Sequence, residues 1–364
     1  MLYARIIIVL SLLCLVFVPG CTSGASMHVE GAYQPAPASG VDFGKFNQLP
    51  KPRLGGLPYP GAFTFFDPID PGDLGSHAYS GPEARERGMI YTCRGGFIDI
   101  AHARKTIDLC KYAAVRFELA LLNDWSAFQI QSREPSIYVV HLQYPPFWKS
   151  LSATEKERLA RELSIRLGQR MAMIMVTWHE VLTWYGYKAS GILPEQQSAF
   201  TYDDTGTHAF GVLVAGRALR DPREWDPAVT SDLSSTLREL HPVAPDETLM
   251  AAQRVEGLWW SGFEPLKRQV ESGLDRPVEP WIVPGLPFCR DAVPYRYPIP
   301  ELGDVLGRDF RGLVHIDIAP NVGESGDILR SIPGSPSVID VDKHLPLVLD
   351  QIRRHSGAQA LRPY

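Results

Sequence analysis

The segment that decides the fold reads SATEKERLARELSIRLGQRMAMIMVTWHEVLTWYG and spans residues 152–186. Its opening Ser-Ala-Thr-Glu is a capping-box pattern, so we predict that a helix begins at Ser152. Leucines that recur every four residues place an apolar stripe along the first half of this helix. From Met171 to Val176 the residues are apolar on every side, which is typical of a helix that has become buried. The pattern therefore predicts one long helix that ends inside the core.

Other apolar patterns place further elements around this helix. A broad apolar face predicts a first helix within residues 95–122, and a capping pattern at Thr201 predicts a third over residues 201–219. Two β-like runs, 127–131 and 136–143, predict a β-hairpin. The remaining expected elements are helices at 232–240 and 246–260, a strand at 314–318 and a closing helix at 342–354. The fold class that follows is α+β and mainly helical, a single globular domain with a small β-hairpin and a mixed C-terminal segment.

The composition excludes several classes of protein. The 364 residues are 45% hydrophobic and 21% charged, which allows a large core and excludes a disordered chain. The formal net charge of −5 argues against an electrostatic nucleic-acid binder, so we expect no nucleic acid among the partners. No apolar run reaches the roughly 18–20 residues that a membrane-spanning helix needs. We therefore expect a globular body outside the bilayer.

The first residues resemble a bacterial lipoprotein signal. Arg5 precedes an apolar run at residues 6–18, and a small residue and Cys21 follow where such a signal is cut. We expect residues 1–20 to be removed and Cys21 to carry the lipid, so that the membrane is a partner through this cysteine. By the same resemblance, Thr22 favours an outer-membrane location in the cell envelope, facing the periplasm. The alternative is an ordinary secretory signal with an unrelated cysteine.

The rest of the chain divides into three parts by composition. Residues 21–60 are rich in Gly, Pro, Ser and Ala, which predicts a flexible tether. We expect the helical core and its site within residues 61–285. Prolines return after the last core helix, so residues 286–364 are expected to form a C-terminal α/β extension packed on the core.

Three predicted helices place titratable side chains among apolar neighbours. Asp99 and His102 are three residues apart, and Asp204 and His208 are four apart, so each pair shares a helical face. Buried carboxylates and imidazoles need compensation, and a cation bound by groups from several helices supplies it. We therefore predict a site for one or two divalent ions of zinc, iron or manganese. Its expected ligands are His102, His179 and Asp204, with Asp99, Asp203 and His208 as further candidates.

Glu180 is the predicted catalytic residue, a general base that takes a proton from the attacking water. His179 and Glu180 begin like the helix motif of zinc peptidases, but that motif needs a second histidine where this chain has Thr183. The motif therefore does not identify a zinc peptidase. Each group also has a structural alternative, because acids in the first turn of a helix act as caps and a core histidine bonds to a nearby carboxylate.

The cysteines indicate a different chemistry. Cys93, Cys110 and Cys289 remain after the signal, and an oxidising compartment predicts one disulfide and one free thiol among them, with the pairing open. Cys93 lies just ahead of the first predicted helix, where the helix dipole would stabilise a thiolate. With His208 as its base, Cys93 loosely resembles the nucleophile of the cell-wall cysteine peptidases. A cysteine hydrolase is therefore an alternative hypothesis.

Three blocks of the chain together resemble an uncharacterised family of bacterial envelope lipoproteins, a domain of unknown function. They are Tyr-Thr-Cys-Arg-Gly-Gly-Phe-Ile-Asp-Ile-Ala-His at 91–102, His-Glu-Val-Leu-Thr-Trp-Tyr-Gly at 179–186 and Ala-Phe-Thr-Tyr-Asp-Asp at 199–204. The family has Asn where this chain has His208, so the resemblance disfavours His208 as a ligand. The site residues that it favours are Asp99, His102, His179, Glu180 and Asp204. It implies no activity, substrate or cofactor.

Two functions from different classes follow from these patterns, beside the cysteine hydrolase. The first is a lipid-anchored envelope hydrolase that uses one or two bound divalent ions. Peptidoglycan, lipid and exported polysaccharide stay open as its substrates. The second is a non-catalytic envelope lipoprotein that scaffolds or binds a partner, in which the helical acids and histidines are structural pairs.

Overall fold

The computed structural model describes residues 43–61, 66–81, 87–188, 195–321, 323 and 325–357. The predicted signal at residues 1–20 and the predicted lipid attachment at Cys21 lie outside these residues. Within the part of the chain that is described, no helix is both long and apolar enough to cross a bilayer.

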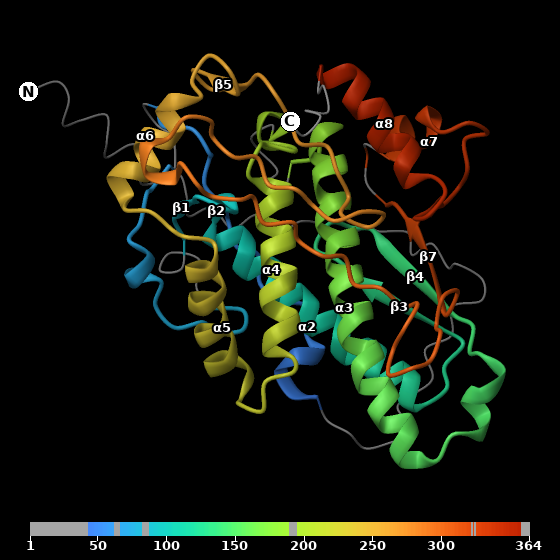
Figure 1. The fold of residues 1–364 in the computed structure, drawn as a ribbon. Coiled ribbons are helices and arrows are strands. Elements are labelled where there is room, and N and C mark those ends of the chain that lie inside the picture. The colour runs from blue at the N-terminus through green and yellow to red at the C-terminus, as the bar shows by residue number, and fades with distance from the viewer. Residues whose placement is uncertain are drawn as a thin grey trace, which may run out of the picture. The chain divides into compact units, whose positions relative to one another are not determined.

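Three helices form the centre of the fold (Figure 1). Helix α2 (Ile100–Leu122) packs against both α3 (Ala153–Trp184) and α4 (Asp204–Ala218). The close approach of α2 and α3 requires glycine, since a Cβ added at Gly168 would lie 2.7 Å from the Cβ of Ala114. Side chains do not approach each other that closely, so a larger residue at this position would separate the two helices.

Helix α3 is the long helix that the sequence predicted. The Ser152 hydroxyl accepts a hydrogen bond from the Glu155 amide, and the Glu155 carboxylate accepts one from the Ser152 amide, which completes the capping box. All six residues from Met171 to Val176 are buried. The capping and the burial are therefore both confirmed, and with them the mainly helical α+β class.

A four-stranded antiparallel sheet completes the core. Its order is β3 (Ala127–Gln131), β4 (Ile137–Leu142), β7 (Val314–Ala319) and β8 (Ile339–Asp340). The first two strands form the predicted hairpin, and β7 is the strand predicted at 314–318. Because Ile316 of β7 pairs with Val140 of β4, the C-terminal segment supplies a strand to the same sheet as the core hairpin.

The start of α2 differs from the prediction. Residues 96–99 do not open a helix but form strand β2 (Gly96–Asp99), which pairs with β1 (Met89–Thr92). Gly96 makes the turn between them with φ +72°, a conformation that glycine adopts without strain. Phe97 and Ile98 then pair across the hairpin, where aromatic and β-branched residues fit a pleated strand. The helix therefore begins only at Ile100.

Smaller elements surround this core. The remaining elements are α5 (Trp225–Glu239), α6 (Pro245–Arg254), β5 (Trp260–Ser261), β6 (Glu264–Pro265), α7 (Ser325–Ser331) and α8 (Leu345–Ser356), with 3₁₀ turns η2 (Gly44–Asn47), η3 (Pro71–Asp73), η5 (Pro146–Ser150), η6 (Gln196–Ser198) and η7 (Pro287–Cys289). The helix predicted at 246–260 ends at Arg254, because the chain turns there into the short β5–β6 hairpin.

The predicted tether to residue 60 is wrong for its described part. Arg53 is 3% exposed, and its Nη2 lies 3.0 Å from Oδ2 of the buried Asp108. His77 Nε2 lies 3.0 Å from the other oxygen of the same carboxylate. Tyr59 is also buried and stacks on Trp260. A buried guanidinium is retained only with such a partner, so this segment belongs to the folded body.

The cysteines form one disulfide and leave one thiol in the described part of the chain, as expected. Cys93 is bonded to Cys289, and Cys110 is free and buried. His208 lies on α4 and not at the start of a strand. The cysteine-hydrolase alternative is therefore wrong. The Cys93 sulfur is bonded in a disulfide and is no free nucleophile, and its proposed base lies on a helix where the hypothesis expected the start of a strand.

Candidate metal centre

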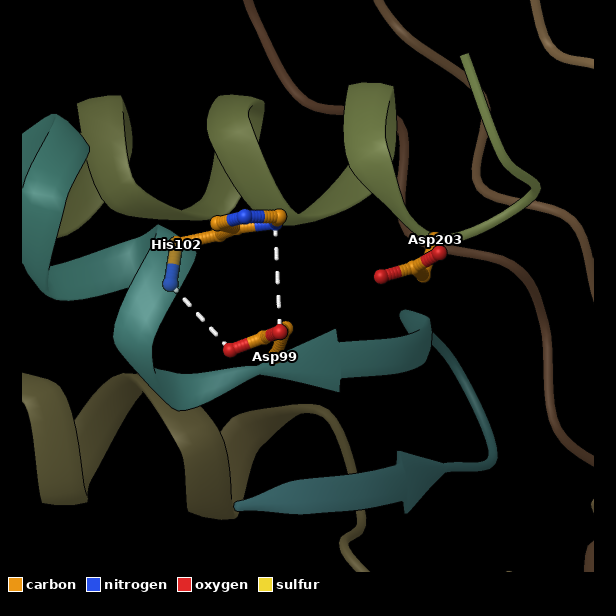
Figure 2. Close-up of side chains that lie close together, drawn as sticks. All are labelled: Asp99, His102 and Asp203. Atoms are coloured by element: carbon orange, nitrogen blue, oxygen red, sulfur yellow. Dashed lines mark hydrogen bonds and ion pairs between the residues drawn. The ribbon is translucent and has the colours of Figure 1, made fainter. Parts of the chain in front are cut away.

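The candidate site forms where β2, α2, α3 and α4 meet. Asp99 ends β2, His102 lies in the first turn of α2, and Glu180 lies near the end of α3. Asp203 and Asp204 begin α4, and His208 follows one turn later. We call these six residues the acid–histidine cluster. Figure 2 shows three of them, with the Asp203 carboxyl group pointing toward Asp99 and His102.

Asp99 is the N-cap of α2. Its Oδ1 accepts hydrogen bonds from the backbone amides of Ala101 and His102, at 2.8 and 3.2 Å. Its Oδ2 accepts one from the Gly56 amide at 2.6 Å and lies 3.8 Å from His102 Nδ1. The same carboxylate therefore starts the helix and faces the site, although the sequence placed Asp99 inside the helix.

His102 carries a positive charge between two carboxylates. Its Nδ1 lies 3.4 Å from Asp204 Oδ1 and 3.8 Å from Asp99 Oδ2. Burial alone would lower the pKa of His102, but the two aspartates outweigh it and raise this pKa to about 9. A proton on His102 thus compensates part of the negative charge in the cluster.

Thr201 links the two acids at the start of α4. Its amide and its Oγ1 lie 2.7 and 2.8 Å from Asp204 Oδ2, and Oγ1 also lies 2.7 Å from Asp203 Oδ1. Burial raises the pKa of Asp203 well above its usual range, and the negative charges of Asp204 and Asp99 add to this effect. A protonated Asp203 can donate to Thr201 Oγ1, which then donates to Asp204. Asp203 Oδ2 has no hydrogen-bond partner among the described residues.

His208 presents an unprotonated nitrogen to the cluster. Thr106 Oγ1 donates its only proton to the His102 carbonyl, so it must accept the hydrogen bond from His208 Nδ1, 2.9 Å away. Burial lowers the pKa of His208 well below its usual range, and the nearby charge of His102 lowers it further. Nε2 therefore carries a lone pair. It lies 3.8 Å from Glu180 Oε1 and has no hydrogen-bond partner in the described part of the chain.

Glu180 is held by a strained segment of backbone. Its Oε2 accepts a hydrogen bond of 2.9 Å from the Phe200 amide. Phe200 is buried and has φ +54°, a left-handed conformation that costs a non-glycine residue about 1–3 kcal/mol. Strained backbone conformations of this kind are most common at functional sites. Here the conformation directs the Phe200 amide toward the Glu180 carboxylate.

His179 does not join the cluster. Its Nδ1 lies 2.6 Å from Glu134 Oε1, and Glu134 Oε2 accepts a hydrogen bond from the Ser132 hydroxyl. Burial alone would raise the pKa of Glu134, but His179 outweighs it and holds this pKa well below its usual range. The prediction of His179 as a ligand is therefore not supported by its position. Glu134, in the turn between β3 and β4, is the partner that sequence reasoning did not identify.

The cluster contains two adjoining groups of possible ligands. Asp99, His102 and Asp203 form one group, and Glu180, Asp204 and His208 form the other. In each group the possible ligand atoms lie within 4.8 Å of one another. The structure thus brings together every predicted ligand except His179, and it adds Glu180, which the sequence predicted as the base. These buried acidic and imidazole groups could hold a metal ion.

A cavity of about 630 Å³ lies beside the cluster. Two residues of the cluster, His102 and Glu180, line this cavity. The neighbouring hydrogen-bonded pair, His179 and Glu134, also lines it. Residues 53–57, which we call the covering segment, form another part of its wall. A Cβ added at Gly55 would collide with the His102 imidazole and would lie 2.6 Å from Asp99 Oδ2. Only glycine therefore allows the covering segment to lie against the cluster.

Comparison with known proteins gives a family and no activity. A family model described as "Protein of unknown function (DUF4056)" matches residues 45–270, which include every residue of the cluster. No curated protein matches the chain, and no solved structure matches it.

Proposed function

We propose that this chain, which belongs to the DUF4056 family, binds one or two divalent metal ions at the acid–histidine cluster and uses them for hydrolysis. The expected ligands are the six residues of the cluster: Asp99, His102, Glu180, Asp203, Asp204 and His208. Imidazole nitrogens and carboxylate oxygens are donors that suit zinc, iron and manganese, which are the ions we expect.

The observation that carries this proposal is that His208 Nε2 is buried without a hydrogen-bond partner among the described residues. Nε2 is buried, is not protonated, and faces a carboxylate oxygen of Glu180 at 3.8 Å. A lone pair and a carboxylate repel each other, and a buried acceptor without a donor costs about 1–3 kcal/mol. A cation bound between them would convert this repulsion into attraction.

The charges of the whole cluster favour the same proposal. Four carboxyl groups lie within it, and the raised pKa values of His102 and Asp203 favour protons on these two groups, which compensate part of the negative charge. A bound ion would take over this compensation and release protons. It would also lower the pKa of a bound water toward neutrality, which is the chemistry that a hydrolase needs. The adjacent cavity supplies room for a substrate.

We place the protein in the cell envelope, anchored by lipid at Cys21 and facing the periplasm. The support is the apolar run and cysteine at the start of the sequence. The disulfide between Cys93 and Cys289 agrees with this location, because disulfides persist in oxidising compartments.

The alternative function is a non-catalytic envelope protein with a purely structural cluster. One observation favours it: Asp99 and Asp204 each accept hydrogen bonds from backbone amides and so act as caps whether or not an ion binds. In that case the protons on His102 and Asp203 alone would balance the buried charges.

Metal analysis of protein purified without a histidine tag separates the two functions. We expect near-stoichiometric zinc, iron or manganese in the wild type and its loss in His208→Ala. His355→Ala, an exposed histidine near the end of α8, is the matched control and should retain the metal. A wild type that stays metal-free after incubation with each of the three ions would contradict the proposal.

A further inference from the structure

We propose that the substrate of this site carries a carboxylate or phosphoryl group on an apolar body, and that Lys105 binds this anionic group inside the cavity. The inference rests on the proposed hydrolase function. It adds the chemical class of the substrate and a specificity-determining residue that neither the sequence pattern nor the family assigns.

Lys105 occupies the position that such a role requires. It lies on α2 three residues after His102, so both side chains share the helix face that borders the cavity. It is half-buried, and it lines the same cavity as His102 and Glu180. An anion held by Lys105 would therefore lie beside the proposed metal ions.

Apart from Lys51 and Arg87, which are exposed, the other charged groups of the cavity wall have partners, whereas the half-buried Lys105 has none among the residues described. Arg53 is paired with the buried Asp108, and Arg133 donates from Nε to the Pro50 carbonyl. The Glu134 carboxylate, which lines the same cavity, is bonded to His179 and Ser132. A half-buried ammonium without a carboxylate is costly, and an anionic ligand would compensate it.

The charge of Lys105 acts on both sides of the cavity. Its positive charge is close enough to act on Glu134 on one side and on His102 and His208 on the other. Lys105 lines the cavity together with residues of both the His179–Glu134 pair and the acid–histidine cluster. An anion at this point would be attracted by Lys105 and by an ion in the cluster together.

The remaining side chains of the cavity wall indicate that the substrate has an apolar body. The apolar side chains that line the cavity are Leu54, Leu57, Tyr59, Leu109, Met175, Tyr187 and Phe263. A cavity of about 630 Å³ with this lining and a few polar groups is typical of a small-molecule site. A purely polar ligand such as free phosphate would leave most of this surface unused.

Calorimetry with defined probes tests the inference. The probes are phenylphosphonate, phenylacetate and the neutral phenylacetamide, each titrated into metal-depleted full-length protein. We expect one of the two anions to bind and Lys105→Met to weaken it at least tenfold, which is about 1.4 kcal/mol. Lys105→Arg should restore most of the affinity, because it keeps the charge. Lys51→Met, an exposed lysine on the rim of the same cavity, should change the affinity less than twofold.

The two anionic probes distinguish a phosphoryl from a carboxylate substrate. Equal affinity of wild type and Lys105→Met, equal binding of the neutral amide, or no binding of either anion would each overturn the inference. Metal content is measured in the same samples. Because the titrations use metal-depleted protein, a wild type that never takes up metal would overturn the proposed function and leave the result for Lys105 intact.

Discussion

Replacing Glu134 with glutamine tests whether His179 is paired with this carboxylate. The two side chains are 10% and 17% exposed, and their hydrogen bond is 2.6 Å long. Hydrogen bonds to charged groups contribute about 1.5–3 kcal/mol, so we expect Glu134→Gln to lower the free energy of unfolding by about 2 kcal/mol at pH 6. Urea denaturation followed by tryptophan fluorescence measures this difference.

The pH dependence makes the prediction specific. His179 holds the pKa of Glu134 well below its usual range, so the carboxylate contributes fully above its unfolded-state pKa of about 4.3 and less as the pH falls. Below that pKa, each fall of one pH unit removes about 1.4 kcal/mol of this contribution to the free energy of unfolding. The difference in unfolding free energy between wild type and Glu134→Gln should therefore shrink by about 1.8 kcal/mol from pH 6 to pH 3.

An exposed ion pair supplies the control for this experiment. Glu271 pairs with Arg276 on the surface, and Glu271→Gln should change stability by less than about 0.5 kcal/mol at either pH. A constant difference between wild type and Glu134→Gln across the pH range would refute the reasoning. His179 would then be free of Glu134, and its assignment as a metal ligand would return.

Three further predictions concern the covering segment, the disulfide and the anchor. Gly55→Ala should weaken zinc binding at least tenfold in competition titrations, since its Cβ displaces His102, whereas Gly303→Ala, whose Cβ would find its nearest neighbour at 3.6 Å, should not. Cys289→Ser should lower the free energy of unfolding by about 2–5 kcal/mol relative to the oxidised wild type, and a reductant should abolish this difference. Cys21→Ser should abolish metabolic labelling with palmitate; unchanged labelling would exclude Cys21 as the anchor.

The periodic parts of the chain could be predicted from the sequence. The capping box at Ser152 and the apolar run from Met171 to Val176 are local patterns, and α3 follows from them. The β3–β4 hairpin and strand β7 follow from short β-branched and aromatic runs. The pairing of β7 with β4 could not be predicted, because it joins segments that are distant in the sequence.

Five of the six predicted ligands lie together in the candidate site, but the sequence did not predict the geometry of that site. Neighbouring positions on a helix point about 100° apart, and in α3 this difference directs His179 and Glu180 to different partners. Glu180 faces α4, and His179 therefore faces the hairpin turn that carries Glu134. Glu134 lies between two strands without any periodic pattern, so only the fold could identify it.

The covering segment shows a second limit of sequence reasoning. Its glycines and prolines are typical of a tether, and composition alone cannot show that Arg53 has a buried partner in α2. Gly55 is required by its close contact with His102 and Asp99 and not by flexibility, and the Gly56 amide donates to Asp99.

The most direct test of the metal site is anomalous X-ray scattering from crystals grown with zinc or manganese. We predict a peak about 2.0–2.2 Å from His208 Nε2, within reach of Glu180 and Asp204. Crystals that show no peak in the acid–histidine cluster, and instead a water hydrogen-bonded to His208 Nε2, would contradict the account.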